Sequence, residues 1–261
     1  MAALEVTGAT VEVGGTAILD DADLRLNRGE VTIVIGPNGA GKSTLLAVAA
    51  GERRAQAGEV KIDGVALGDL SVAELAKRRA VMPQDTTVAF PFTVREVVAM
   101  GRTVWNDRPG AADAVAMEAL ETIGLAAFAD RAITTLSGGE TQLVAFARVI
   151  AQITPVGDSS VVLLDEPTAA MDVAHAEATL RTARLLASQG AAVGIVLHDL
   201  DAAAAYADRL VLMHQGCVRR TGTVGDVCVE ALLSEVYGSP IEVYDHAGAI
   251  RVAPRRRFEP A

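Results

Sequence analysis

Residues 36–44 read Gly36-Pro37-Asn38-Gly39-Ala40-Gly41-Lys42-Ser43-Thr44. They follow an apolar run at residues 31–35, and they lead into a second apolar run at residues 45–50 that Gly51 closes. The first run predicts a buried parallel strand, and the second predicts a helix. A strand, a glycine-rich loop and a helix in this order are the setting of a phosphate-binding P-loop, so we predict one here.

The residue types of this loop suit a polyphosphate. Its glycines let the backbone turn tightly with the N–H groups pointing inward, at the positive end of the following helix. In such a loop Lys42 reaches the β- and γ-phosphates, and the hydroxyl of Ser43 is a ligand for Mg²⁺. We therefore expect residues 36–44 to hold a nucleotide together with Mg²⁺. A simple glycine-rich turn is the alternative, and the complete motif disfavours it.

Length, net charge and cysteine content limit the possible architectures and the possible binding partners. A chain of 261 residues is long enough for one large α/β domain, and we expect it to carry a small subdomain. The net charge of −10 disfavours a nucleic-acid partner held by a basic field. The one dense basic run, residues 255–257, is expected to be a solvated tail. Cys217 and Cys228 are too far apart for a CxxC metal pair and fit a reducing compartment.

No stretch of the sequence predicts a secretory signal or a membrane span. The first residues lack both a basic region and an apolar region. The longest uncharged stretch, residues 185–198, has 14 residues, which is too short to cross a bilayer. We expect the chain to reach a membrane only through a partner.

Periodicity marks three segments of the chain. Residues 4–35 alternate apolar and polar positions around a Gly14-Gly15 turn, which predicts an antiparallel sheet before the P-loop. Residues 86–147 have helical periodicity and are predicted to be an insertion into an α/β core. Within them, Thr93 and Glu96 have the spacing of a capping box. Residues 226–261 predict a short helix and a final pair of small strands.

A second anion site is predicted at Leu136-Ser137-Gly138-Gly139-Glu140. Ser137 is a good N-cap, and the two glycines leave the first N–H groups of the next helix unobstructed. Since one nucleotide needs only one P-loop, the second site suggests that two copies meet head to tail, each donating it to the other's nucleotide. A capped surface helix is the alternative.

Two carboxylates follow a buried strand. Residues 161–164 are apolar and predict a strand of a parallel sheet beside the P-loop strand, with Asp165 and Glu166 at its carboxyl edge. Asp165 is a candidate to hold Mg²⁺, and Glu166 is a candidate general base for the attacking water. The alternative, in which both acids cap the next turn, explains one of them at most.

His198 ends a third buried strand, predicted at residues 191–197. A lone histidine is by default a satisfied or surface residue. Here the same sheet edge favours a contact between the imidazole and the γ-phosphate.

The motifs now in order are residues 36–44, Gln84, residues 136–140, residues 163–166 and His198. In their order and spacing, the chain resembles the ATP-binding subunit of ABC transporters along nearly its whole length. The resemblance implies a single ABC ATPase domain over residues 1–261. Its P-loop NTPase core would carry an N-terminal antiparallel β subdomain, the inserted helical subdomain and a short C-terminal extension.

The resemblance also implies roles for residues and partners. Gln84 would sense the γ-phosphate and the metal, acting in catalysis with Glu166 and His198. Residues 169–172 match the family's D-loop, so Asp172 would lie at a dimer interface. Two copies would close on two ATP molecules, hydrolyse them and reopen, moving a dimer of permease subunits between its facing states. The segment after Gln84 would form the groove that receives the permease.

A narrower resemblance is to importers of iron chelates, haem and cobalamin. It rests on residues 93–102, 197–200, 205–209 and 235–238. The segment from residue 81 to residue 93 is most similar to haem importers. These partners imply a place on the cytoplasmic face of the cell membrane, with a periplasmic or lipid-anchored binding protein acting through the permease.

One departure from the family concerns the nucleotide base. The N-terminal strand of the family usually offers an aromatic ring that stacks on adenine, and Val13 occupies that position here. No aromatic residue precedes Phe90.

Other functions remain open at this point. Haem is the expected cargo of an importer, and a ferric siderophore or cobalamin is the alternative. A soluble ABC ATPase that acts as an assembly factor, for example for iron–sulfur clusters, would share the hydrolytic residues. A P-loop kinase or GTPase would leave residues 136–140 and His198 unexplained. The single short cassette and the importer-like segment favour transport.

Overall fold

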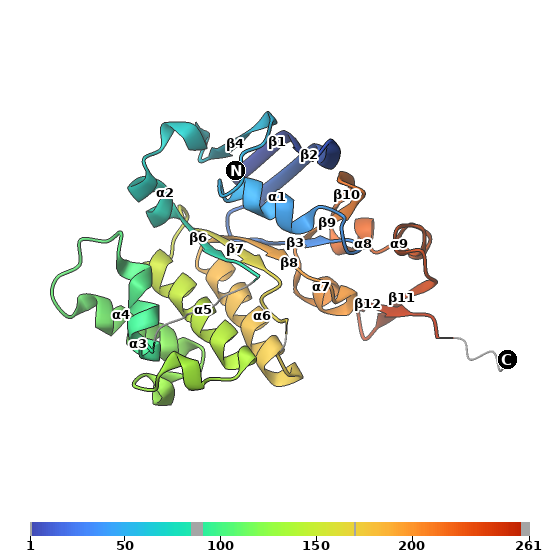
Figure 1. Ribbon diagram of the computed structural model, residues 1–261. Helices are drawn as coiled ribbons and strands as arrows, with labels where there is room; N and C mark the ends of the chain where they lie inside the picture. Colours follow the sequence, from blue (N-terminus) through green and yellow to red (C-terminus); the bar gives the residue numbers. More distant parts are fainter. Residues whose placement is uncertain (1, 85–90, 170, 257–261) are drawn as a thin grey trace.

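A computed structural model describes residues 2–84, 91–169 and 171–256 (Figure 1). Parts of the segments that the sequence analysis used lie outside this description: residues 85–90, residue 170 and residues 257–261. No helix within the described part of the chain is both long and apolar enough to cross a membrane.

A six-stranded sheet forms the centre of the molecule. Its strands, in spatial order, are β10 (Cys217–Gly222), β9 (Arg209–His214), β3 (Val31–Ile35), β8 (Ala192–Val196), β7 (Val161–Asp165) and β6 (Arg79–Met82). All neighbours run parallel except β10, which forms a hairpin with β9. Every residue of β3 and β8 is buried, as expected for parallel strands that are covered on both faces.

Two layers cover this sheet, and alternate residues of β3 face them. Ile33 and Ile35 pack in the apolar cluster that contains α5 (Gly138–Ile153) and α6 (Val173–Ser188), whereas Val34 packs in the cluster of α1 (Lys42–Ala49) and the N-terminal sheet. Figure 1 shows α1 and the N-terminal sheet on one side, with α5 and α6 on the other. The strand that leads into the P-loop is therefore held between two hydrophobic layers.

The prediction that the strand of Asp165 lies beside the P-loop strand is wrong. β8 pairs with both β3 and β7 and separates them. Strands 161–165 and 192–196 are both short, apolar and buried, so composition does not distinguish which of them pairs with β3. Their spatial order depends on the path of the helical crossovers between them. Both strands nevertheless end at the same edge of the sheet.

The N-terminal sheet is antiparallel, as predicted. It consists of β1 (Ala2–Val13), β2 (Thr16–Asn27), β4 (Ala57–Ile62) and β5 (Val65–Ala66), in the order β2-β1-β4-β5. Gly14 and Gly15 form the β1–β2 turn with φ of 58° and 79°, values that L side chains rarely adopt. A 3₁₀ turn (Leu67–Asp69) and α2 (Val72–Arg78) lead from this sheet to β6.

Helices occupy the chain between β6 and β7. They are α3 (Val94–Ala99), a 3₁₀ turn (Met100–Arg102), α4 (Ala111–Thr122), two further 3₁₀ turns (Ala126–Phe128 and Ile133–Thr135) and α5. The capping box that opens α3 is confirmed, since the Glu96 N–H donates to Thr93 Oγ1 at 3.2 Å and the Thr93 N–H donates to Glu96 Oε2 at 2.7 Å. α5 continues past residue 147, the predicted end of the insertion, and packs against β6 and β7 of the central sheet.

The chain after β8 folds against the same sheet. α7 (Leu200–Tyr206) precedes β9, and α8 (Val224–Val227) and α9 (Glu230–Tyr237) follow β10. The hairpin of β11 (Ile241–His246) and β12 (Ala249–Pro254) is the last part described, and it lies beside α7 (Figure 1).

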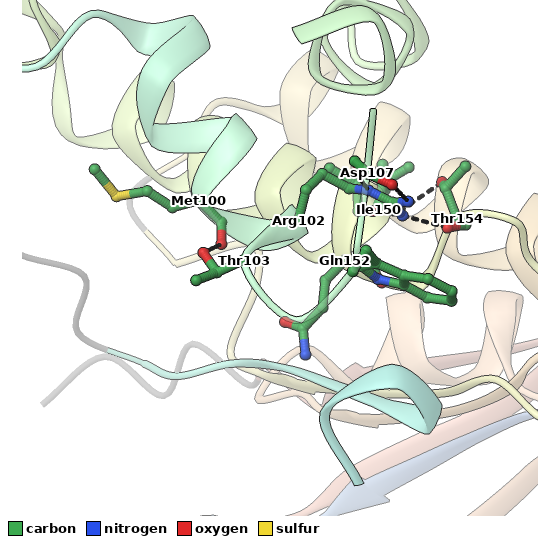
Figure 2. Close-up of polar contacts among 9 residues, drawn as sticks. Met100, Arg102, Thr103, Asp107, Ile150, Gln152 and Thr154 are labelled. Atoms are coloured by element: carbon green, nitrogen blue, oxygen red, sulfur yellow. Dashed lines mark hydrogen bonds and ion pairs between the residues drawn. The ribbon is translucent and has the colours of Figure 1, made fainter. Parts of the chain in front are cut away.

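A buried arginine fastens the helical segment to the end of α5. Arg102 contacts both carboxylate oxygens of Asp107, with Nε to Oδ2 at 2.8 Å and Nη2 to Oδ1 at 2.9 Å. Its Nη1 donates to the carbonyls of Ala151, at 3.0 Å, and Thr154 (Figure 2). A cation at these carbonyls also interacts favourably with the negative end of the helix dipole.

Trp105, the only tryptophan, extends this contact. Its ring centroid lies 4.5 Å from the Arg102 guanidinium carbon, and its Nε1–H donates to the Gln152 carbonyl at 2.8 Å. The Gln152 side chain then donates to the carbonyls of Ala76 at 2.8 Å and Arg79 at 3.0 Å. One network thus joins α5 to α2 and to the first residue of β6.

We expect Arg102→Ala to lower the free energy of unfolding by about 2–4 kcal/mol, because carbonyls that accept from a buried cation lose their donor. Urea denaturation followed by circular dichroism measures this change. Arg219→Ala is the matched control, since that arginine forms an exposed ion pair with Glu235 and should cost less than about 1 kcal/mol. Equal losses in the two variants would contradict the structural role of the Arg102 network.

Candidate nucleotide-binding site

The P-loop leaves no room for side chains at two of its glycines. A Cβ on Gly36 would lie 2.3 Å from the Met213 carbonyl oxygen, and one on Gly41 would lie 2.7 Å from the Ile18 carbonyl oxygen. Gly41 has φ of 97° and stands at the start of α1, where the Leu45 N–H donates to its carbonyl at 2.8 Å. The loop is thus clamped between β9 and β2, with the helix N-terminus behind it.

Lys42 is the first residue of α1, and its side chain is almost fully buried. Its ammonium group donates to the carbonyls of Gly36 at 2.8 Å and Pro37 at 3.0 Å. Burial lowers the pKa of Lys42, while the nearby carboxylates of Glu166 and Asp165 oppose that change. The cation therefore lies inside the loop that is predicted to hold phosphates.

Ser43, the second residue of α1, meets Asp165, the last residue of β7. The Ser43 hydroxyl donates to Asp165 Oδ1 at 3.0 Å. Burial raises the pKa of the Asp165 carboxyl, and the bond from Ser43 acts in the opposite direction. A hydroxyl and a carboxylate oxygen are thus paired at the edge of the sheet where Lys42 lies.

Glu166 stands at the centre of the site. Its backbone has φ of 51°, a left-handed conformation that is uncommon for residues other than glycine, and its N–H donates to the Val196 carbonyl at 3.1 Å. Each carboxylate oxygen has its own partner: Gln84 Nε2 donates to Oε2 at 3.2 Å, and His198 Nε2 is hydrogen-bonded to Oε1. Backbone strain of this kind is concentrated at functional sites.

Most of the P-loop, Gln84, Glu166 and His198 line one open cleft of about 540 Å³. Its walls are Ile18, residues 38–44, Gln84, Glu166 and His198. Asp165 does not line this cleft itself and is joined to it through the hydroxyl of Ser43. Ile18 was not predicted. It is an ordinary apolar residue of β2, and only the approach of the N-terminal hairpin to the P-loop brings it here. Val13, the predicted position of a base-stacking residue, is half exposed and does not line this cleft.

The remaining predicted site residues are not in this cleft. Ser137 caps α5 as expected, with the Glu140 N–H donating to its hydroxyl at 3.3 Å and Glu140 Oε2 accepting from the Ser137 N–H at 2.7 Å. Asp172 caps α6, accepting from the His175 N–H at 2.8 Å. Within the described residues, neither Asp172 nor residues 137–139 line the cleft. The site of one chain therefore includes the P-loop, Gln84, the two acids and His198, but not the second predicted anion site.

Comparison with known families agrees with this arrangement. The family model described as ABC transporter matches residues 19–169, which is more than half of the chain and includes the P-loop, Asp165 and Glu166. The chain belongs to the ABC transporter family. It is accordingly an ATP-binding subunit of the ABC type, an enzyme whose hydrolysis of ATP is coupled to transport, and the predicted fold class is confirmed.

Individual relatives of this ABC protein are known by sequence and structure. The hemin import ATP-binding protein HmuV of Rhodococcus jostii is 50% identical over 97% of this chain and 86% of its own length. A metal-chelate type ABC transporter, solved in an inward-facing conformation, contains a chain with a TM-score of 0.80 and 25% identity, covering 98% of this chain and 99% of its own. A bacterial ABC transporter cassette solved as a dimer has a TM-score of 0.74 and 28% identity, covering 85% of this chain and 98% of its own.

Proposed function

We propose that this chain is the ATP-hydrolysing subunit of a haem importer, acting as a homodimer on the cytoplasmic face of the cell membrane. The proposed ATPase activity rests on the contacts of Glu166. Its two carboxylate oxygens are hydrogen-bonded to Gln84 and His198 in the cleft of the P-loop. The likeness to hemin import proteins, at 50% identity over 97% of the chain, supports the cargo.

The P-loop would bind the triphosphate of ATP. Backbone N–H groups of residues 36–44 and the N-terminus of α1 supply donors and positive potential. Lys42 supplies a full positive charge that can turn from the Gly36 and Pro37 carbonyls to phosphate oxygens. Binding energy for the nucleotide would thus come mainly from its phosphates.

The donor set beside the loop fits Mg²⁺. The Ser43 hydroxyl and the Asp165 carboxylate lie 3.0 Å apart, and both are hard oxygen ligands of the kind that Mg²⁺ prefers. Burial of Asp165 raises its pKa, so a cation at this position would be favourable for the carboxylate. Ser43, Asp165 and Gln84 are the residues that would hold it. When bound, the ion neutralises phosphate charge.

Glu166 would act as the general base. A water beside its carboxylate would lose a proton to it while attacking the γ-phosphorus in line with the leaving ADP oxygen. Gln84 and His198 would orient the carboxylate, and the imidazole would contact the γ-phosphate as the bond to ADP breaks. Inorganic phosphate and ADP are the products.

A second copy would complete the site. Residues 137–139 form a helix N-terminus with free glycine N–H groups, and they lie outside the cleft of their own chain. A head-to-tail homodimer would bring these residues, and Asp172 at the interface, to the nucleotide of the partner. The relative solved as a dimer supports such an assembly. Closure and reopening of the dimer would move the helical subdomain, residues 86–147, and with it a dimer of permease subunits.

A pull-down tests the transport role. Tagged protein carrying Glu166→Gln, purified from gently solubilised membranes, should bring down a permease with many membrane spans, identified by mass spectrometry. Uptake of haem, ferric siderophore and cobalamin by cells with that permease then tests the cargo, and haem is the expected one. Recovery of soluble partners alone would refute the importer and favour an assembly factor.

We expect weak discrimination between ATP and GTP, because Val13 offers no aromatic ring and Ile18 is the apolar wall of the cleft. The ratio of kcat/KM for the two nucleotides should stay below about a hundredfold, since a stacking contact is worth only about 0.5–1.5 kcal/mol. Steady-state hydrolysis assays measure this ratio, and a selectivity above a hundredfold in the unaltered protein would contradict the expectation.

A further inference from the structure

Hydrogen bonds hold the chain on both sides of His198. On one side, the Leu197 N–H donates to the Val34 carbonyl of the P-loop strand at 3.2 Å. On the other side, Asp199 caps α7, and its Oδ1 accepts from the N–H groups of Asp201 at 2.9 Å and Ala202 at 3.0 Å. The first turn of α7 therefore sets the path of the chain at His198, whose side chain is 45% exposed.

The C-terminal hairpin holds this first turn. Two donors from β12 converge on the carboxylate of Asp201: Arg251 Nη1 reaches Oδ2 at 3.0 Å, and the Val252 N–H reaches Oδ1 at 3.1 Å. Val252 is buried and belongs to the same apolar cluster as Ala203 of α7. Because each carboxylate oxygen of Asp201 has its own donor, both the position and the rotation of the carboxylate are constrained.

The hairpin is itself fastened to the core. Arg255, the residue that follows β12, donates from Nε to Glu242 Oε1 at 2.7 Å and from Nη2 to Glu230 Oε1 at 3.1 Å. It thereby joins β11 to α9, whose Leu233 and Val236 are buried. The two arginines thus have different partners: Arg251, within β12, contacts α7, whereas Arg255, just after β12, contacts α9 and β11.

We propose that the C-terminal hairpin positions His198 for ATP hydrolysis, with Arg251 as the positioning residue that acts through Asp201 and the first turn of α7. The inference rests on the proposed function of His198. Asp201 is three residues from His198 in sequence, so a shift of its helical turn displaces the imidazole relative to Glu166 and the γ-phosphate. Small displacements of this kind reduce turnover more than they reduce binding of the substrate.

Hydrolysis kinetics of three variants provide the first test. Arg251→Ala should lower kcat by about three- to tenfold with the KM for ATP unchanged within about twofold, because the P-loop holds the phosphates. Arg251→Lys keeps the cation and should recover most of kcat. Arg255→Ala is the matched control, as it removes an arginine from the same hairpin without a contact to α7, and its kcat should change by less than about twofold.

A spectroscopic readout separates positioning from general stability. The chain has four histidines, so ¹⁵N-histidine labelling yields few imidazole signals, and the His198→Ala variant assigns one of them. The His198 signals should shift in Arg251→Ala and stay in place in Arg255→Ala. Unchanged kcat and unchanged His198 signals in Arg251→Ala would overturn the proposal, as would equal losses in the two alanine variants. If the unaltered protein failed to hydrolyse ATP, the proposed function would fail instead, and the His198 signals would still test the positioning.

Discussion

Glu166→Gln is expected to abolish ATP hydrolysis and to leave ATP binding intact. The amide has the shape of the carboxylate and keeps a hydrogen-bond acceptor for Gln84, but it does not take up a proton from water. Removal of a general base typically costs a factor of about 10²–10⁴ in rate. Phosphate release measures turnover, and equilibrium dialysis with ATP measures binding.

The same variant should accumulate as a closed dimer with ATP, because hydrolysis is the step that would reopen it. Size-exclusion chromatography with and without ATP detects this change. Glu121→Gln, an exposed position on α4, is the matched control and should hydrolyse ATP at the normal rate. A Glu166→Gln protein that stays monomeric with ATP would count against Glu166 as the base.

Lys42→Ala has the second large effect, and here binding itself is lost. Lys42 provides the buried positive charge of the P-loop, and charged hydrogen bonds to phosphate contribute about 1.5–3 kcal/mol each. The Kd for ATP should therefore rise by at least about tenfold, and hydrolysis should fall with it. Isothermal titration calorimetry measures the Kd.

The control for this loss is Lys61→Ala, which removes an exposed lysine whose partner, Glu59, lies on the same strand. Its Kd for ATP should be unchanged. Retained affinity in Lys42→Ala would mean that the nucleotide does not bind at residues 36–44.

Local signals explain why much of the fold was predictable. The glycines of the P-loop, the Gly14-Gly15 turn, the capping box at Thr93 and the N-cap at Ser137 act through neighbours in the chain, and each is present as predicted. Apolar runs of strand length likewise mark the buried strands. The acids and His198 were placed at one sheet edge because parallel strands end together.

Long-range pairing explains what was missed. The sequence analysis placed β7 beside β3, whereas β8 lies between them. The prediction failed because β7 and β8 are apolar strands of equal length, and either could pair with β3. Ile18 has no motif, and it reaches the cleft only through the packing of β2 against the P-loop. The left-handed backbone of Glu166 depends on its bond to Val196, a residue of another strand.

The sequence alone therefore predicted the P-loop, the candidate base and metal ligands, and a second anion site in the same chain, because each prediction depends on residues a few positions apart. The tertiary structure alone showed which residues share one cleft. It also showed that residues 137–139 are outside that cleft and that Arg251 holds the turn after His198. These relations join segments far apart in the chain, and they are set by packing of the whole core, which local residue preferences do not specify.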